Sequence, residues 1–448
     1  MKKSTKLMTL LMAMVLATGS LAACGGKDEP AATNAPEATN AEGGNSEGGT
    51  PTDVSLTVWV PQEDTQEYSG YEEGLTKHMC DEFNKAQSKW NIKADIKPMS
   101  EGDAYQNVTK DPSKAADIML VAGDNLVQLV DKELVSPITI AEGEDVKNNN
   151  PELAVAGATF NDESLGGEYL FGVPFSPNTW FMYYDKSKYS EEEVKSLETM
   201  MAKDIKGTKY NFSMKMEDSW YSPAFFFAAG CNLFGADGMD PKSCDFNSKA
   251  GVSAAKYMMD LANNKKFFSE VAEEVGLSYL EDGSLAAWCG GTWNAGAVKK
   301  ALGDNYAATV MPTVKIDGND VSLKPYSSYK YIAVKATEDV QKAEAAQALA
   351  VWLGGEQCQT DRLAARETAP TWNSVAESDA AKNSPAVAAC IAQGASGYKQ
   401  PGITQMNNVW DPVKAFSTWA ISKDAKEDKI QGELDKLVEN ILAEIKEG

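Results

Sequence analysis

Aromatic residues stand beside carboxylate or amide residues at several points of this 448-residue chain. A pyranose ring packs its face of C–H groups on an aromatic side chain, and its hydroxyl edge needs hydrogen-bond partners. The candidate groupings are Trp59 with Glu63 and Asp64, Trp180 with Asn178, Trp220 and Tyr221 with Glu217, Trp293 with Asn294, and Trp410 with Asp411. Their residue types suit the binding of a sugar.

The chain carries none of the common catalytic signatures. There is no GxxxxGK[ST], GxSxG or HExxH motif. The single histidine, His78, lies beside Met79 inside an expected amphipathic helix, so we interpret it as structural. With one histidine and no CxxC pair, the usual zinc ligand sets cannot be assembled. We therefore expect no catalytic residue, no metal and no cofactor.

The first 24 residues have the order of an export signal. Two lysines precede an apolar run over residues 7–16, and the sequence LAAC follows at 21–24. The run is too short to span a bilayer. LAAC resembles the lipobox of bacterial lipoproteins, in which the cysteine receives a diacylglycerol and becomes the first mature residue. That resemblance predicts a signal peptide over residues 1–23 and lipidation at Cys24.

A tether follows the predicted lipidation site. Residues 25–52 are mostly Gly, Ala, Asn, Thr, Ser, Pro and Glu, which cannot bury a core. A flexible segment of roughly 30 residues has a mean reach of about 30 Å. Residues 24–52 are therefore expected to hold the folded part near the outer face of a cell membrane, in a cell of the Gram-positive type.

The net charge of the chain limits the classes of partner that it is expected to bind. A net charge of −23 argues against nucleic acid and against charge-driven adhesion to anionic lipid headgroups. We expect membrane attachment through the lipid on Cys24 only, and a monomer.

Six further cysteines leave two alternatives open. Outside the cell they can pair as disulfides or remain free thiols, and sequence cannot decide between the two. They are Cys80, Cys231, Cys244, Cys289, Cys358 and Cys390, of which Cys231 and Cys244 are closest along the chain.

Strand and helix patterns alternate from residue 53 onward. The spacing predicts strands over 56–60, 91–97 and 116–121, and a helix over 72–89 with Leu75, Met79 and Phe83 on one face. Further helices are expected over 190–204, 247–263, 338–353 and 425–446, and strands over 285–288, 307–311 and 329–335. This alternation predicts an α/β fold.

Short fragments in a fixed order resemble the extracellular solute-binding proteins of bacterial carbohydrate ABC importers, most of all the maltose and maltodextrin-binding proteins. The fragments are LTVW at 56–59, DI at 117–118 with AGD at 122–124, GVP at 172–174 with YDK at 184–186, GGTW at 290–293, PT at 312–313, and QM at 405–406 ahead of Trp410.

The resemblance implies two α/β lobes joined by a hinge, with a ligand cleft between them. It places the N-terminal lobe at 53–175 plus 327–372 and the C-terminal lobe at 176–326 plus 373–448, with crossings near Phe175, Tyr326 and Trp372. It further implies an oligosaccharide ligand, lobe closure on that ligand, delivery to an ABC permease and no catalysis.

Carried over by position, the resemblance gives the candidate site. Trp293 and Trp410 match stacking aromatic residues of the second lobe. The polar positions are Glu63, Asp64, Asp124, Asn125 and Asn178, and the remaining candidates are Glu217, Trp220 and Tyr221. Charged acceptors make the stronger hydrogen bonds, about 1.5 to 3 kcal/mol.

The chain departs from the enteric maltose-binding pattern at two places. Where that pattern has Trp-x-x-Asp-Arg, the chain has VAGDN at 121–125, so one stacking ring and one fork of donors are missing. Asn178 stands where an acid is expected, and Trp180 or Tyr329 could substitute for the missing ring. Xylo-, fructo- or galacto-oligosaccharides are therefore alternatives to maltodextrin. A glycoside hydrolase, with two acids flanking the scissile bond, and a surface adhesin are further alternatives.

Overall fold

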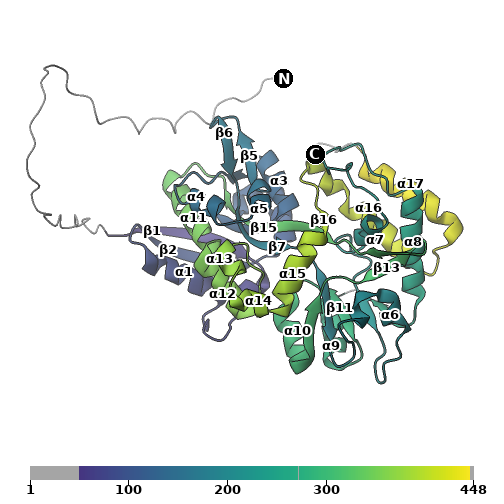
Figure 1. The fold of residues 1–448 in the computed structure, drawn as a ribbon. Helices are drawn as coiled ribbons and strands as arrows, with labels where there is room; N and C mark the ends of the chain where they lie inside the picture. The colour runs from purple at the N-terminus through teal and green to yellow at the C-terminus, as the bar shows by residue number, and fades with distance from the viewer. Residues whose placement is uncertain (1–49, 271, 444–448) are drawn as a thin grey trace, which may run out of the picture.

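A computed structural model describes residues 50–270 and 272–443 of the chain. The predicted signal peptide, Cys24 and most of the predicted tether lie outside the described residues. Two sheets, each with its own helices and apolar core, lie side by side (Figure 1). The fold is thus α/β with two lobes, as the sequence predicts.

The first lobe is built on a seven-stranded sheet of order β16-β15-β3-β1-β2, in which β4 and β7 also pair with β15. Its strands are β1 (Thr52–Val60), β2 (Trp90–Pro98), β3 (Ile118–Ala122), β4 (Val135–Ser136), β7 (Val173–Asn178), β15 (Tyr326–Lys335) and β16 (Tyr398–Lys399). Strands β1, β2 and β3 run parallel, whereas β15 runs antiparallel to β3 and β7.

Burial along the strands explains the layers of this lobe. All four residues 118–121 of β3 are buried, which requires cover on both faces of the sheet. One helix pair is α1 (Leu75–Ala86) with α11 (Val340–Leu353), and a second is α2 (Glu101–Lys110) with α3 (Gly123–Asp131). In α1 the predicted stripe of Leu75, Met79 and Phe83 is buried.

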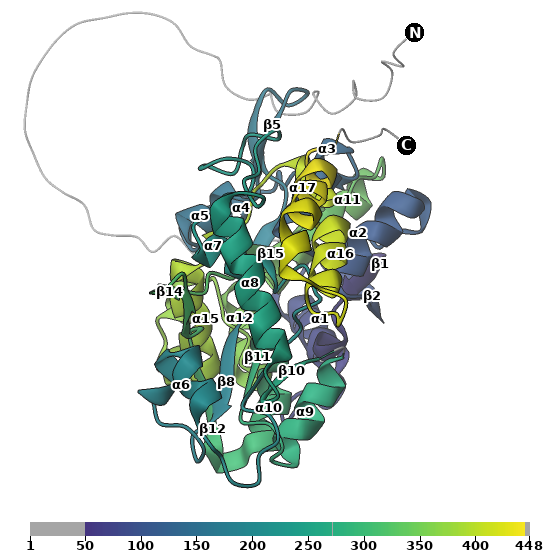
Figure 2. The same cartoon turned by 90° about the vertical axis from the view of Figure 1, so that its right-hand side faces the viewer.

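The second lobe is built on a five-stranded sheet of order β10-β9-β11-β8-β12. Its strands are β8 (Phe181–Asp185), β9 (Phe212–Met214), β10 (Phe267–Ser269), β11 (Ala287–Gly290) and β12 (Tyr306–Thr309). Its helices include α8 (Lys249–Asn263), α16 (Trp410–Ala420) and α17 (Ile430–Ile441), which lie together in Figure 2.

The remaining elements connect or cover the two sheets. The helices are α4 (Gly143–Asn148), α5 (Glu152–Ala156), α6 (Leu197–Ala202), α7 (Pro223–Ala228), α9 (Glu273–Glu281), α10 (Ala295–Leu302), α12 (Glu356–Arg366), α13 (Asn373–Ala376), α14 (Asp379–Asn383) and α15 (Pro385–Ser396). Two hairpins are β5 (Thr159–Asp162) with β6 (Gly167–Leu170), and β13 (Thr313–Ile316) with β14 (Asn319–Ser322). None of the helices within the described ranges has both the length and the apolar character needed to cross a membrane.

The chain joins the two sheets more than once. Strand β7 continues the first sheet to Asn178, and β8 of the second sheet begins three residues later. Strand β15 connects the lobes directly, because its first residue, Tyr326, lies in the second core while Tyr331 lies in the first. The exact lobe boundaries given above stay a prediction.

Candidate functional site

A cavity of about 980 Å³ lies between the two lobes and is lined by residues from both. From the first lobe come loops and helix starts at the carboxyl ends of β1, β2 and β3. From the second lobe come residues of the segment before α7, of the turn after β11 and of the start of α16. Open α/β sheets bind ligands at such strand ends.

Eight of the ten predicted binding residues line this cavity. They are Glu63, Asp124, Asn125, Asn178, Trp220, Tyr221, Trp293 and Trp410. They come from segments as far apart in the chain as Glu63 and Trp410, so the fold brings together side chains that the sequence analysis named from residue type and from the family resemblance.

Asp124 owes its place to the turn between β3 and α3. Gly123 starts the helix, and a Cβ there would lie 3.2 Å from the backbone oxygen of Tyr329, so only glycine allows this close approach without a shift of its neighbour. Asp124 follows in the first helical turn with its carboxylate buried. Burial raises the pKa of Asp124 to about 6, although the backbone N–H groups of Asp124 and Asn125 oppose the shift. Near neutral pH it is a charged acceptor.

Two aromatic rings of the cavity wall, Trp220 and Trp410, lie close together, with their ring centroids 6.5 Å apart. Trp220 stacks on the buried Tyr326 at 5.5 Å, and Trp180 donates a hydrogen bond from Nε1 to the Trp220 backbone oxygen at 3.1 Å. Both Trp220 and Trp410 remain partly exposed. The second core thus holds two rings at the cavity surface.

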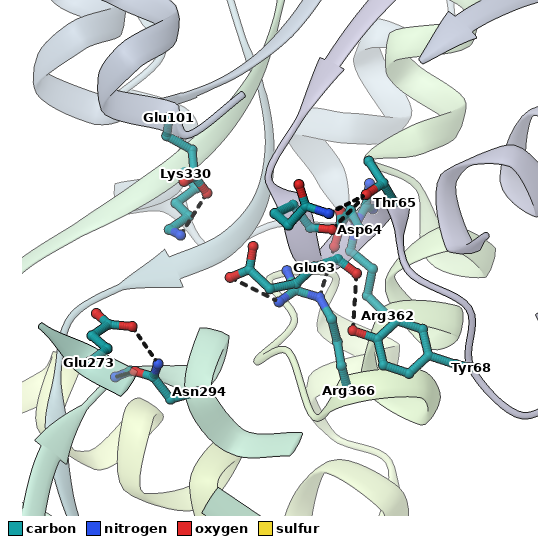
Figure 3. Close-up of polar contacts among 12 residues, drawn as sticks. Glu63, Asp64, Thr65, Tyr68, Glu101, Glu273, Asn294, Lys330, Arg362 and Arg366 are labelled. Atoms are coloured by element: carbon teal, nitrogen blue, oxygen red, sulfur yellow. Dashed lines mark hydrogen bonds and ion pairs between the residues drawn. The ribbon is translucent and has the colours of Figure 1, made fainter. Parts of the chain in front are cut away.

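Trp293 occupies a different part of the wall. It follows the turn after β11, where Asn294 donates to Glu273 at 2.8 Å (Figure 3). The Lys330 ammonium of β15 lies 5.0 Å from the Trp293 ring centroid and also pairs with Glu101 of α2 at 2.7 Å. Trp293 is therefore contacted from the opposite lobe by a cation.

Asp64 does not reach the cavity. It follows Glu63 in the 3-10 helix η1 (Gln62–Thr65), and its carboxylate is fully buried between two guanidinium groups. Arg362 donates from Nε to Asp64 Oδ2 at 2.9 Å, and Arg366 Nε lies 2.8 Å from Oδ1 (Figure 3). Burial raises the pKa of Asp64, but the two arginines outweigh it and hold the pKa below its usual value. Asp64 is ionised in an internal network.

Four other residues from the sequence analysis also lie away from the cavity wall. Glu217 is partly buried but is not a lining residue. Trp59 and Trp180 are core residues of the first and second lobe, respectively. His78 lies in α1 with its ring edge-on to Tyr71 at 4.9 Å.

Several lining residues were not predicted from the sequence. They include Glu101, Tyr105, Lys215, Glu273, Lys330, Arg366, Gln400 and Asn407. Glu273 and Arg366 belong to α9 and α12, which the sequence analysis did not identify, and the others are single polar residues with no distinctive spacing.

The charge of the wall indicates what it can bind. Seven carboxylates and three cationic side chains line the cavity, together with aromatic rings and amides. This excess of acceptors suits hydroxyl donors and disfavours an anion.

Among the described residues, no group of three or more His, Cys, Asp or Glu side chains is arranged to hold a metal ion. The six cysteines from Cys80 to Cys390 are all free thiols, so Cys231 and Cys244 are not paired.

The sequence of the chain is similar to those of known proteins. A model of the family described as bacterial extracellular solute-binding protein matches residues 78–389. A galactooligosaccharide-binding protein of Bacillus subtilis is 24% identical over 99% of this chain and 98% of its own length. A maltooligosaccharide ABC transporter solute-binding lipoprotein of Streptococcus pneumoniae is 26% identical over 95% of this chain and 94% of its own.

Solved structures share the whole fold. One determined with acarbose has a TM-score of 0.79 and 32% identity, and covers 87% of this chain and 99% of its own. A maltodextrin-binding protein of L. casei BL23, solved without ligand, has a TM-score of 0.74 and 26% identity, over 88% of this chain and all of its own.

Proposed function

The chain belongs to the bacterial extracellular solute-binding proteins, and on this premise we propose that it captures an oligosaccharide between its lobes and delivers it to an ABC permease. Maltodextrin is the ligand we favour. The observation that carries the proposal is a cleft in which Trp220, Trp293 and Trp410 share the wall with carboxylates and amides. Rings supply stacking surfaces, and acceptors bind hydroxyl groups.

Galacto-oligosaccharide is the second candidate ligand. It is supported by the Bacillus subtilis galactooligosaccharide-binding relative, which aligns with nearly the whole chain. The maltooligosaccharide and maltodextrin-binding relatives support the first candidate in the same way. Both ligands are neutral chains of pyranoses, and they differ in linkage and in the orientation of individual hydroxyl groups.

Calorimetric titration of the purified protein tests the proposal. The panel consists of maltose, maltotriose, longer maltodextrins, and galacto-, xylo- and fructo-oligosaccharides. Tight binding of maltotriose or longer glucans is the expected result. Tight binding confined to another sugar would replace maltodextrin, and no binding across the panel would overturn the sugar-binding proposal. Release of shorter sugars during incubation would instead indicate a hydrolase.

Anchoring belongs to the same proposal. The lipobox resemblance at Cys24 and the lipoprotein name of the Streptococcus pneumoniae relatives support a lipid-anchored protein at the outer face of the membrane. In a Gram-positive host, Cys24→Ser should abolish incorporation of labelled palmitate and shift the protein out of the washed membrane fraction. Ser46→Ala in the tether is the control, because it leaves the lipobox unchanged. Unchanged labelling of Cys24→Ser would contradict anchoring at this residue.

A further inference from the structure

Helix α12 carries two arginines, whereas every other cationic side chain of the Lys and Arg type in the chain is a lysine. Of its 42 Lys and Arg residues, only Arg362 and Arg366 are arginine. Both reach the same carboxylate, that of Asp64. A guanidinium differs from an ammonium by its rigid planar fork of N–H donors. The chain therefore has this fork at one place only, beside the cavity.

The two guanidinium groups have different surroundings. Arg362 is fully buried, donates from Nη1 to the Leu353 backbone oxygen at 2.6 Å and does not line the cavity. It holds Asp64 from the core side. Arg366 does line the cavity, although its side chain is only 7% exposed.

Arg366 has donors to spare. Its Nε lies 2.8 Å from Asp64 Oδ1 as an ion pair, and its Nη1 lies 4.0 Å from Glu63 Oε1. Both atoms are buried, and neither makes a hydrogen bond to any residue the structure describes. Because Arg366 lines the cavity and its guanidinium group makes no hydrogen bond through these two atoms, it can donate to an oxygen acceptor of a bound ligand.

We propose that Arg366 is a ligand-binding residue of the cleft, donating its N–H fork to adjacent oxygen atoms of a bound sugar, and that Asp64 is a positioning residue that orients it. The inference rests on the proposed function and deepens it. Asp64 and Glu63 offset the charges of Arg362 and Arg366, so the group suits neutral hydroxyl oxygens and does not require an anionic ligand.

This assignment also accounts for a departure noted in the sequence. The maltose-binding pattern has an arginine directly after the acid at position 124, and this chain has Asn125 there. Arg366 supplies a donor fork from another helix to the same cavity. The sequence analysis placed Asp64 in direct contact with the ligand, whereas here it acts through Arg366.

A matched pair of substitutions in the full-length protein tests the proposal. Arg366→Lys and Arg362→Lys both keep a positive charge near Asp64, but only the first removes a fork from the cavity. Calorimetry with maltotriose, or with galactotriose if the wild type prefers it, should show at least tenfold weaker binding for Arg366→Lys. Arg362→Lys should lower the thermal midpoint and leave the affinity within about threefold.

A second measurement follows the arginine side chains of the wild-type protein by NMR. With only two arginines, the wild-type protein labelled with ¹⁵N-arginine has two Nε–H resonances, and Arg362→Lys identifies them by removing one. On titration with the sugar, the Arg366 resonance should shift, and the Arg362 resonance should shift less.

The outcomes separate this inference from the proposed function. Wild-type affinity in a folded Arg366→Lys variant, or an Arg366 resonance that ignores a sugar the wild type binds, would overturn the role of Arg366 and leave the proposed function intact. A wild type that binds no sugar of the panel would overturn both. Preference for an acidic oligosaccharide, tested with oligogalacturonate, would contradict the neutral ligand.

Discussion

Trp293 and Trp410 are the residues on which stacking can be tested most directly. Either change to alanine removes a ring from the cavity wall, so binding of the best sugar should weaken by at least about tenfold, or 1.4 kcal/mol. Trp419 is the matched control, because it lies on α16 with Trp410, is partly buried and does not line the cavity. Trp419→Ala should bind the sugar as the wild type does in calorimetry. Unchanged affinity in both cavity variants would place the site elsewhere.

Asp124 should make binding depend on pH. Its pKa is raised to about 6 by burial, so it becomes neutral as the pH falls through 6 and loses its charged acceptor. Sugar affinity should therefore decrease between pH 7.5 and pH 5. Asp124→Asn should bind more weakly at pH 7.5 and show a flatter profile in titrations at the two pH values. An equal slope in both proteins would assign the pH dependence to another group.

The sequence predicted which residues line the cavity better than it predicted which side chains they contact. The aromatic and polar groupings and the family resemblance together gave eight residues that share one cavity, because strand and helix ends carry them there. Asp64 was placed in the ligand site because the maltose-binding pattern has a polar pair after the first strand, where this chain has Glu63 and Asp64. Its partner Arg362 is 298 positions away, and no local pattern reveals that a distant helix buries a carboxylate.

At the scale of elements, helix α8 contains a glycine that its packing requires. Ser248 caps the helix by accepting a hydrogen bond from the Gly251 N–H, and a Cβ at Gly251 would lie 1.8 Å from the Phe246 backbone oxygen. Gly251→Ala should therefore destabilise the protein by about 1–3 kcal/mol despite the helix preference of alanine. Urea unfolding measures this difference.

Gly432 in α17 is the control for that prediction. A Cβ there meets nothing within 4 Å, so Gly432→Ala should be neutral or should stabilise by up to about 1 kcal/mol. Equal stability of the two alanine variants would show that the turn before α8 relaxes freely.

Helices and strands with a regular apolar periodicity were predicted better than a largely buried helix that lacks one. The expected strands at 56–60, 91–97 and 116–121 and the helices at 72–89, 247–263 and 338–353 each correspond to an observed element within a few residues. The tail helix expected from 425 begins at Ile430, after a 3-10 turn. Helix α15 was missed because it is rich in small residues and is buried at Ala386, Val387, Ala389 and Cys390, so it shows no simple amphipathic stripe.

For the whole molecule, side-chain hydrogen bonds cross between the lobes. Gln128 of α3 donates to the Thr404 backbone oxygen at 2.7 Å, and Asn407 donates to the Tyr105 hydroxyl at 3.0 Å. A ligand shifts an equilibrium between open and closed forms only if it binds one of them better. The proposed function requires that form to be the closed one.

Small-angle X-ray scattering can test this closure. The radius of gyration should decrease when the preferred sugar saturates the protein, and it should stay constant with a sugar of the panel that does not bind. In Trp410→Ala the same decrease should require a higher sugar concentration. A radius unchanged by a tightly bound sugar would contradict lobe closure.

Strand β15 also determines when the first lobe can be completed. An exported chain crosses the membrane from its N-terminus, yet β3 in the first sheet has β15 as a neighbour, and β15 ends at Lys335. The sheet that starts at Thr52 therefore stays incomplete until most of the second lobe has emerged. Such pairing between distant segments slows folding. The same strand that joins the lobes thus delays completion of the first sheet until residues 326–335 are available for pairing.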